Sequence, residues 1–216
     1  MNRPVALFDL DYTLINADSE EAWSKFLFQR HLVDRSFVEG IEAFYQDYEQ
    51  GKLDFYAYEQ FFLGSLGSIS SKDLLALRKD YLKEISAAIR PWMMAQVDWH
   101  RAQGHELLLI TASNHFTTEI IAKKLQFRNI ICTIAEKKRG KFTGKITGIP
   151  AFQSGKVSLL TDWLRENRFT LEGSWGYSDS HNDLPILNLV ENPVAVSPDA
   201  VLKNHAVLHH WRILDK

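Results

Sequence analysis

Short apolar runs alternate with segments of helical periodicity along most of the chain. The runs cover residues 5–8, 106–110, 129–133, 175–177 and 193–196. Continuous apolar runs of this length are typical of strands buried on both faces, as in a parallel sheet. Helical patterns lie between them and begin at Pro91, near His115, at Gly155 and near Asp183. This alternation predicts a doubly wound, mostly parallel α/β sheet.

Residues 16–89 break this alternation. The segment contains no convincing strand, and its aromatic residues, Phe55 and Tyr58 among them, recur at helical spacing. Such stripes predict the core of a small helical bundle. The expected architecture is therefore a Rossmann-like core, residues 1–15 and 90–216, with a helical cap, residues 16–89, inserted after the first strand.

A basic run and an alternating segment follow the third apolar run. Lys137–Arg139 stands just before Gly140 and is expected to lie in a solvated loop. Residues 141–148 alternate between polar and apolar positions and contain glycine. This pattern predicts a small β-hairpin with glycine at its turn.

The composition is that of a folded domain without a nucleic-acid surface. Of the 216 residues, 45% are apolar and 24% are charged, and the formal net charge is −2. A nucleic-acid interface would require a basic stripe, so none is expected. The single cysteine, Cys132, cannot form an internal disulfide, and its apolar surroundings predict a buried thiol. No secretory signal and no apolar run of membrane-spanning length are evident, so we expect a cytoplasmic protein without a membrane partner.

Asp9 and Asp11 directly follow the first strand. They are therefore expected at its carboxyl end, where open α/β sheets bind ligands. Two close carboxylates repel each other unless a cation or a shared proton compensates, and a hard divalent cation with oxygen ligands is the natural compensation. One aspartate can then attack a phosphoryl group, while the other protonates the leaving oxygen. The alternative is a pair of strand-end acids that cap a turn.

Polar residues at the ends of later strands favour the first interpretation. Thr111 ends the second strand, where its hydroxyl and the following N–H groups could bind phosphate as a helix begins. Lys156 stands at a helix start, where its ammonium could offset concentrated negative charge. Asp179 and Asp183 follow the fourth strand.

This full set resembles the haloacid dehalogenase superfamily, and within it the phosphoserine-phosphatase-like branch known as subfamily IB. The four signature segments occur in the family's order and span the whole chain, and the aspartate pair with Thr13 is highly specific. An insertion after the first strand also matches the helical cap of that branch. The resemblance implies a magnesium-dependent phosphatase that acts on a small phosphorylated metabolite through a phosphoaspartate.

The resemblance also implies roles for the acidic residues. Asp9 would be the nucleophile and Asp11 the general acid and base. Mg²⁺ would be held by the Asp9 carboxylate, the Asp11 backbone carbonyl and the Asp179 carboxylate. Asp183 would support the waters of the metal and Lys156.

Three further residues would hold the phosphoryl oxygens by the same resemblance: Thr111, Lys156 and Asn182. The dehalogenases of the superfamily lack the second aspartate of the first motif. The presence of Asp11 therefore favours phosphoryl chemistry.

Three rival functions are weighed against this one. A two-component receiver domain also combines acids, a hydroxyl, a lysine and magnesium, but its acids are adjacent and its phosphorylated aspartate ends a later strand. A catalytically inactive relative would be expected to lack Asp9 or Asp11, and both are present. A phosphotransferase that passes the phosphoryl group to an alcohol stays open, and an assay with acceptor alcohols would decide. The sequence leaves the oligomeric state open as well.

No functional role is assigned to the histidines from the sequence. His205 and His209 are spaced as zinc ligands on a helix can be, and His210 follows, but no glutamate lies between the pair and no cysteine is near. A surface or core-edge segment is the preferred interpretation. His115 and His181 stay unassigned.

Substrate choice is inferred from the phosphoserine phosphatases, in which a glutamate binds the amino group and a cap arginine binds the carboxylate. The resemblance places Asp18 at the glutamate's position and Gln60 at the arginine's. A neutral amide cannot replace a bidentate guanidinium. Histidinol phosphate or another amino-alcohol phosphate is therefore the best candidate, since branch members similar around Asp18 act on histidinol phosphate. Phosphoserine is the alternative if Arg78 or Arg90 binds a carboxylate and Gln60 is an exposed helix residue.

Overall fold

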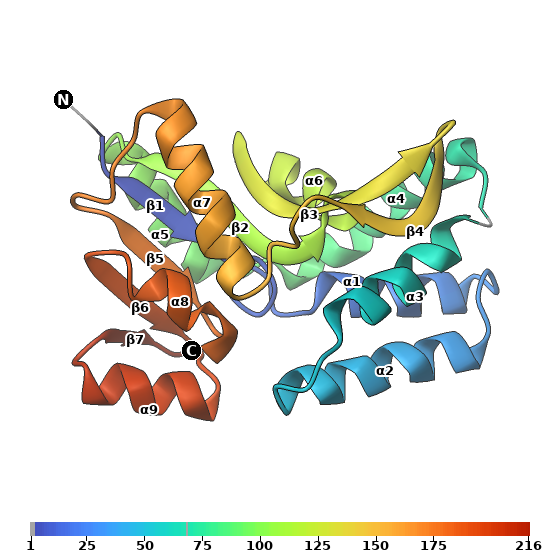
Figure 1. The fold of residues 1–216 in the computed structure, drawn as a ribbon, viewed down its shortest axis with the longest axis horizontal. Helices are drawn as coiled ribbons and strands as arrows, with labels where there is room; N and C mark the ends of the chain where they lie inside the picture. The colour runs from blue at the N-terminus through green and yellow to red at the C-terminus, as the bar shows by residue number, and fades with distance from the viewer. Residues whose placement is uncertain (1–2, 68) are drawn as a thin grey trace.

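A seven-stranded sheet forms the centre of the computed structural model, which describes residues 3–67 and 69–216 (Figure 1). The strands are β1 (Val5–Phe8), β2 (Glu106–Asn114), β3 (Asn129–Lys138), β4 (Lys141–Thr147), β5 (Trp175–Ser178), β6 (Asn192–Val196) and β7 (Arg212–Leu214). Their order across the sheet is β4-β3-β2-β1-β5-β6-β7, and every neighbouring pair is parallel except β3 and β4. The predicted doubly wound, mostly parallel α/β fold is confirmed.

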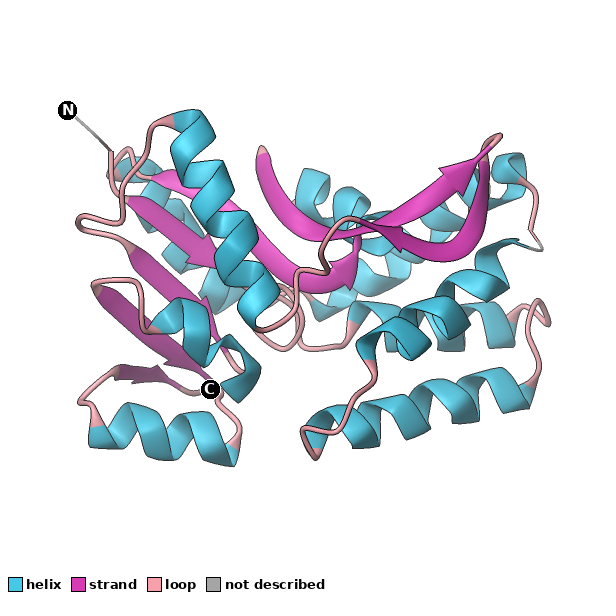
Figure 2. Cartoon of the chain, viewed as in Figure 1, coloured by secondary structure: helices cyan, strands magenta, loops and turns pink. Residues whose placement is uncertain are grey.

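Helices cover both faces of this sheet and a region beyond its end (Figure 2). They are α1 (Ser19–Gln29), α2 (Arg35–Glu49), α3 (Phe55–Gly67), α4 (Ser71–Ile85), η1 (Ser86–Ala88), α5 (Pro91–Ala102), α6 (His115–Lys124), α7 (Ser154–Asn167), η2 (His181–Asp183), α8 (Leu184–Leu187) and α9 (Ala200–Leu208). Successive side chains of a strand point to opposite faces. Ala6 and Phe8 accordingly pack in one buried cluster with α5 and α6, and Val5 and Leu7 in a second with α7 and α8.

The register around β1 positions the residues that follow three strands. Phe8 pairs with Leu109 of β2 and with Tyr177 of β5. Parallel strands end at the same edge of a sheet, so the residues just beyond these pairs share that edge. Asp9, Thr111 and Asp179 are therefore brought together by backbone pairing alone.

The chain leaves the sheet after β1 and returns to it through α5. An isolated bridge joins Ile15 to Ile89, and the Arg90 N–H donates to the Leu14 carbonyl, so the two connecting segments run side by side. Between them the described residues form helices α1 to α4 and η1, and no strand, as the aromatic pattern predicts. Trp23 of α1 lies in the same buried cluster as Phe8. The division into a core, residues 1–15 and 90–216, and a cap, residues 16–89, stays a prediction.

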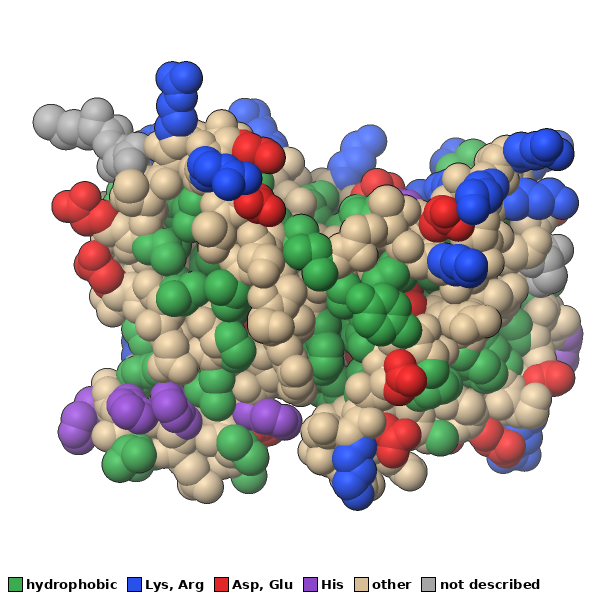
Figure 3. All heavy atoms as spheres, in the orientation of Figure 1, with side chains coloured by type: hydrophobic (Ala, Val, Ile, Leu, Met, Phe, Trp, Pro, Cys, Tyr) green, Lys and Arg blue, Asp and Glu red, His purple; other side chains and the backbone are tan. Residues whose placement is uncertain are grey.

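The structure contains a β-hairpin here, but residues 141–148 supply only one of its strands, so the predicted hairpin is wrong. Residues 141–147 form one strand, β4, which pairs antiparallel with the long end of β3, and the turn lies at Arg139 and Gly140. Gly140 has a φ of 78°, a conformation that glycine adopts without steric cost. The basic run is solvent-exposed, and Figure 3 shows Lys and Arg side chains gathered at this end of the molecule. Only Arg139 of that run belongs to the turn, since Lys137 and Lys138 end β3.

Candidate active site

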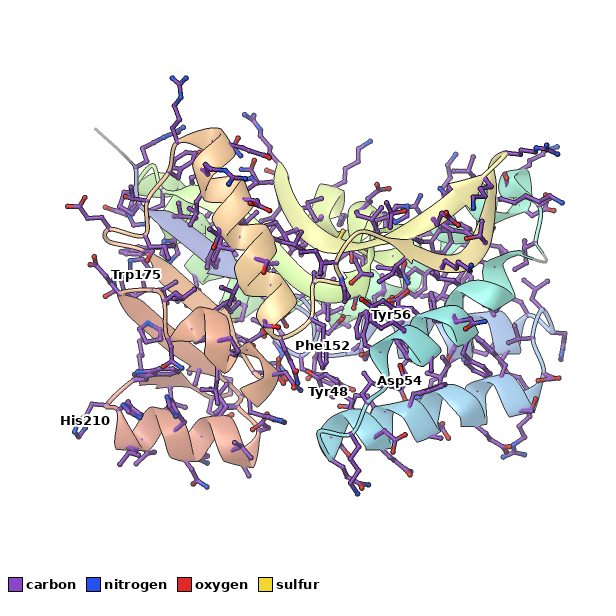
Figure 4. The ribbon with its side chains drawn as sticks, viewed as in Figure 1. Tyr48, Asp54, Tyr56, Phe152, Trp175 and His210 are labelled. Carbon is purple, nitrogen blue, oxygen red and sulfur yellow. The ribbon has the colours of Figure 1, made fainter. Side chains whose placement is uncertain are left out.

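A pocket lies at the carboxyl edge of β1, β2 and β5, beneath helices α2 and α3. Aromatic side chains from α2, α3 and the loop before α7 line part of it. Figure 4 shows two of these, Tyr48 and Phe152, where the helices approach the edge of the sheet. Acidic side chains also line the pocket: Asp9, Asp11, Asp18, Glu20, Glu21, Asp179 and Asp183. Among the described lining residues, Lys156 is the only lysine or arginine.

Lys156 binds two of these acids at once. Its Nζ lies 2.9 Å from Asp9 Oδ1 and 2.7 Å from Asp183 Oδ1, and all three side chains are buried. Ser178 Oγ also donates to Asp183, at 2.7 Å. Burial raises the pKa of Asp9 to about 6, although the Lys156 charge opposes the rise. Burial alone would lower the pKa of Lys156, but the charges of Asp183 and Asp9 outweigh it and raise that pKa.

The start of α7 places Lys156 beside Asp9. A Cβ on Gly155 would lie 2.0 Å from the carbonyl oxygen of Pro150, so only glycine allows the loop to come this close to the helix. Lys156 follows in the first helical turn and reaches into the sheet edge. The glycine and the lysine therefore act together in positioning the ammonium.

Asp11 lies in a different environment from Asp9. Its Oδ1 accepts the Ser19 N–H at 2.8 Å, and its Oδ2 accepts the Ser113 hydroxyl. Burial, followed by the charges of Asp18 and Asp9, raises its pKa well above the ordinary range. A carboxyl group with a raised pKa is suited to donating a proton.

The acids near Asp179 fit a hard divalent cation. Asp179 accepts the Thr13 hydroxyl at 3.2 Å, and burial together with the charges of Asp9 and Asp183 raises its pKa well above the ordinary range. Within the described ranges no three His, Cys, Asp or Glu side chains form a ligand group on their own. Two carboxylates, a backbone carbonyl and waters would suit Mg²⁺, which usually keeps several waters and binds through one or two carboxylates.

The three predicted phosphate-binding residues face the same pocket. Thr111 is buried and lines the pocket together with Lys156 and Asn182. It does not end its strand as predicted, because β2 continues to Asn114 after an irregularity in register that follows Ile110. Asn182 Oδ1 accepts a hydrogen bond from Gln153 Nε2 at 2.7 Å. The structure thus brings these residues together with Asp9, as a phosphoryl site requires.

Asp18 lines the pocket and also caps a helix. It is the N-cap of α1, and its Oδ1 accepts the N–H groups of Glu20 and Glu21 at 2.9 and 2.8 Å. Such a cap contributes about 1 kcal/mol to helix stability. Burial raises the pKa of Asp18. Its predicted role in binding an amine is compatible with this placement and stays a prediction.

Glu20 is a pocket acid that sequence reasoning missed. It is buried, its Oε1 accepts the Asn114 N–H at 2.8 Å, and its Oε2 accepts the Tyr58 hydroxyl. Burial raises its pKa to about 7. The signal lies in the helical pattern, because Glu20 falls on the same stripe as the buried Trp23 and Leu27. An acid on such a stripe either has a specific partner or serves a site.

Gln60 does not reach the pocket, which corrects the sequence-based assignment. Its side chain is exposed and lies beside Gly144 of β4. Phe55 and Tyr58 of the same helix line the pocket instead. The reason is helical geometry, since Gln60 lies two residues, or about 200° around the axis, from Tyr58.

The two arginines considered as substitutes also lie elsewhere. Arg78 pairs with Glu119 at 3.3 Å. Arg90 donates to Asn16, in the segment that leaves β1, and to Ser197, in the loop after β6. Neither is among the described residues that line the pocket. A carboxylate-binding arginine is therefore not found at this site.

The histidines without a predicted role, and Cys132, have partners or neighbours elsewhere in the fold. His115 Nδ1 accepts the Ala135 N–H at 3.0 Å, and His181 pairs with Asp199 at 2.8 Å. The rings of His205 and His209 stack on each other at the C-terminal end of α9, and Figure 4 shows His210 at the same end. Cys132 is buried as predicted, and burial raises its pKa to about 12. Among the described residues no helix is long and apolar enough to cross a bilayer.

Comparisons with known proteins identify a family and several proteins that this chain resembles. The model of the haloacid dehalogenase-like hydrolases matches residues 6–188. The chain is 39% identical over 217 residues to a histidinol-phosphatase of Neisseria meningitidis serogroup C, covering 98% of each chain. It is 30% identical over 215 residues to a phosphoserine phosphatase of Mycobacterium tuberculosis, covering 97% of this chain and 70% of that protein. A crystal structure of a protein of unknown function from Bordetella pertussis Tohama I has a TM-score of 0.92 at 32% identity, covering 100% of this chain and 99% of that chain.

Proposed function

The chain belongs to the haloacid dehalogenase-like hydrolases, and on this basis we propose that it is a magnesium-dependent phosphomonoesterase that works through a phosphoaspartate on Asp9. One observation carries the proposal. Two aspartates share a pocket in different environments: the Asp9 carboxylate lies 2.9 Å from the Lys156 ammonium, whereas Asp11 accepts the Ser113 hydroxyl and has a pKa raised by burial and by the charges of Asp18 and Asp9. Paired carboxyls whose surroundings separate their protonation states are suited to nucleophile and acid roles.

The residues divide the reaction into two displacements. Asp9 attacks phosphorus, a new P–O bond forms to its carboxylate, and the ester P–O bond breaks as the leaving oxygen takes the Asp11 proton. Asp11, now a carboxylate, then removes a proton from a water whose oxygen attacks the same phosphorus. Inorganic phosphate leaves and the Asp9 carboxylate is restored. Thr111, Lys156 and Asn182 hold the phosphoryl oxygens throughout.

Mg²⁺ would be held by the Asp9 and Asp179 carboxylates and the Asp11 carbonyl, with Asp183 supporting its waters. When bound, the ion neutralises charge on the phosphoryl group. Asp183 also pairs with Lys156 at 2.7 Å, so it would order both the ammonium and the waters of the ion. We expect this chemistry to take place in the cytoplasm.

The substrate we propose is histidinol phosphate. The pocket carries seven acids against one lysine, and no arginine lines it within the described part of the chain. A cationic amine would be attracted to Asp18 in these surroundings, whereas the carboxylate of phosphoserine would be repelled and left without a partner. The aromatic side chains of α2 and α3 also offer faces on which an imidazole can stack. The 39% identity to a histidinol-phosphatase over 98% of both chains supports the same choice.

A comparison of four substrates tests this function. Phosphate release is measured for histidinol phosphate, phosphoethanolamine, phosphoserine and p-nitrophenyl phosphate at equal Mg²⁺. We expect histidinol phosphate to exceed phosphoserine by about a hundredfold in kcat/KM, since an unpaired buried charge costs several kcal/mol and each 1.4 kcal/mol is a factor of ten. Phosphoethanolamine, which has the amine but no imidazole, should lie between them. Equal rates with phosphoserine and histidinol phosphate would refute the substrate assignment, and no hydrolysis of any of the four would refute the phosphatase itself.

A further inference from the structure

The loop before α7 carries a strained residue next to the phosphate site. Gln153 has φ 47° and ψ −118°, a backbone conformation that residues with a Cβ rarely adopt. It occupies the N-cap position of α7, yet its side chain makes no capping hydrogen bond. The side chain instead donates from Nε2 to Asn182 Oδ1 at 2.7 Å. The positive φ belongs to a backbone turn, which the Gly155 N–H closes by donating to the Phe152 carbonyl at 2.8 Å. This turn presents the Gln153 amide to Asn182.

The residue before Gln153 contacts the helices above the pocket. The Phe152 ring lies 5.0 Å from the Phe55 ring of α3, nearly parallel to it, and 6.1 Å from the Tyr48 ring of α2. Figure 4 shows Phe152 and Tyr48 together at the junction of these helices with the sheet edge. Phe152 therefore contacts α2 and α3, while the next residue, Gln153, contacts Asn182.

Asn182 receives a second connection from the same helices. Its Nδ2 lies 3.4 Å from Ser180 Oγ, at the outer limit of a hydrogen bond. Ser180 Oγ also accepts the Asn182 N–H at 3.2 Å and lies 2.8 Å from the Tyr48 hydroxyl of α2. Contacts from α2 and α3 thus converge on Asn182 through Ser180 and through Gln153.

The orientation of the Asn182 amide decides what it offers to a phosphoryl group. A carboxamide has a donor on one edge and an acceptor on the other, and a phosphoryl oxygen can pair only with the donor. Because Gln153 donates to Oδ1, Nδ2 is turned away from Gln153. Without that bond the amide could flip and point its oxygen at the phosphoryl oxygens, which would repel it.

We propose that Gln153 is a positioning residue that holds the Asn182 side chain with its Nδ2 group toward the phosphoryl group. The ring contacts of Phe152 link this orientation to the positions of α2 and α3. The proposal rests on the phosphate-binding role of Asn182 in the proposed function. Gln153 is not among the described residues that line the pocket, so it acts through Asn182.

Two variants separate positioning from a purely structural role. Gln153→Gly removes both the amide and the strain, and Gln153→Met keeps the size but cannot donate. Inhibition by inorganic phosphate, kcat/KM and the unfolding temperature are measured for each. We expect Gln153→Gly to raise the unfolding temperature, because glycine adopts positive φ readily. Both variants should weaken phosphate inhibition about tenfold or more, as expected for one lost hydrogen bond to a charged group.

The Asn182→Ala background shows whether the effect passes through Asn182. There, neither Gln153 variant should change phosphate inhibition further. Arg168→Gly is the matched control, since Arg168 also has positive φ, 58°, but is exposed at the other end of α7. It should raise the unfolding temperature and leave phosphate inhibition unchanged.

Three results overturn the proposal. Unchanged phosphate inhibition and kcat/KM in both Gln153 variants would show that Gln153 positions nothing. An equal loss in the Asn182→Ala background would show that Gln153 acts by another route. Unaltered phosphate inhibition in Asn182→Ala alone would remove the basis of the proposal, while leaving the phosphatase function intact. Failure of the proposed function would differ from all three, because the unmodified enzyme would then release no phosphate.

Discussion

Replacing Glu59 by glutamine is expected to stabilise the protein increasingly as the pH rises. Glu59 lies on α3 with 1% of its surface exposed. Among the described residues none donates a hydrogen bond to either of its carboxyl oxygens. Burial, reinforced by the charge of Glu20, raises its pKa well above the ordinary value of 4.5. We therefore expect the folded protein to hold this side chain in its neutral form.

The sign and size of the effect follow from proton binding. Above about pH 4.5 the unfolded chain releases the Glu59 proton, whereas the folded chain keeps it until the pH reaches the raised pKa. The free energy of unfolding consequently falls by about 1.4 kcal/mol for each pH unit in that window. Glu59→Gln has no proton to release in either state. Its stability relative to the unmodified protein should therefore grow by up to about 2.7 kcal/mol between pH 5 and pH 7.

Urea unfolding at pH 5, 6 and 7 measures this difference directly. Taking the difference between the two proteins removes the titrations of the acids that do not interact with Glu59, which leaves those of Glu59 and its neighbour Glu20. Glu42→Gln on α2 is the matched control, because Glu42 is exposed. Its difference from the unmodified protein should stay nearly constant with pH. A constant difference for Glu59→Gln as well would refute the argument and show that Glu59 is ionised in the folded state.

Three predictions concern the pocket itself. Asp11→Asn should lower kcat by about 10²–10⁴ in steady-state assays, because an amide cannot pass on a proton. A chelator should abolish phosphate release and Mg²⁺ should restore it, with Ca²⁺ restoring little because it is larger and less strict in geometry; full activity after exhaustive chelation would contradict the metal requirement. Asp18→Asn should lower kcat/KM for histidinol phosphate more than for p-nitrophenyl phosphate, and since asparagine caps helices as well as aspartate does, α1 should be retained. Equal losses for both substrates would show that Asp18 binds no amine.

The sequence predicts well which residues meet at the carboxyl edge of the sheet, because few strand arrangements are compatible with its pattern. Asp9 directly follows an apolar run of four residues, and such a run indicates a buried strand. Parallel pairing of this strand with its neighbours then brings Thr111 and Asp179 to the same edge of the sheet. The order of the signature segments along the chain predicts that Asp11 and Lys156 belong to the same site. Alternation and strand ends are local properties, so they can be read without a structure.

The features that the sequence did not predict depend on contacts distant in the chain. Gln60 was misplaced because its face of α3 is set by packing against β4, which begins 81 residues later at Lys141. The β3–β4 hairpin was misread because β3 continues into a charged end that resembles a loop. Glu20 was missed because its partners, Asn114 and Tyr58, lie on other elements.

Trapping the phosphorylated enzyme tests the central claim most directly. The enzyme is mixed with histidinol phosphate and Mg²⁺, quenched in acid within the first turnovers, digested and analysed by mass spectrometry, with Asp9→Asn treated in parallel. The account predicts base-labile phosphate on Asp9, and none in Asp9→Asn, since an amide is a poor nucleophile. Phosphate found on another residue, or hydrolysis that continues in Asp9→Asn, would contradict it.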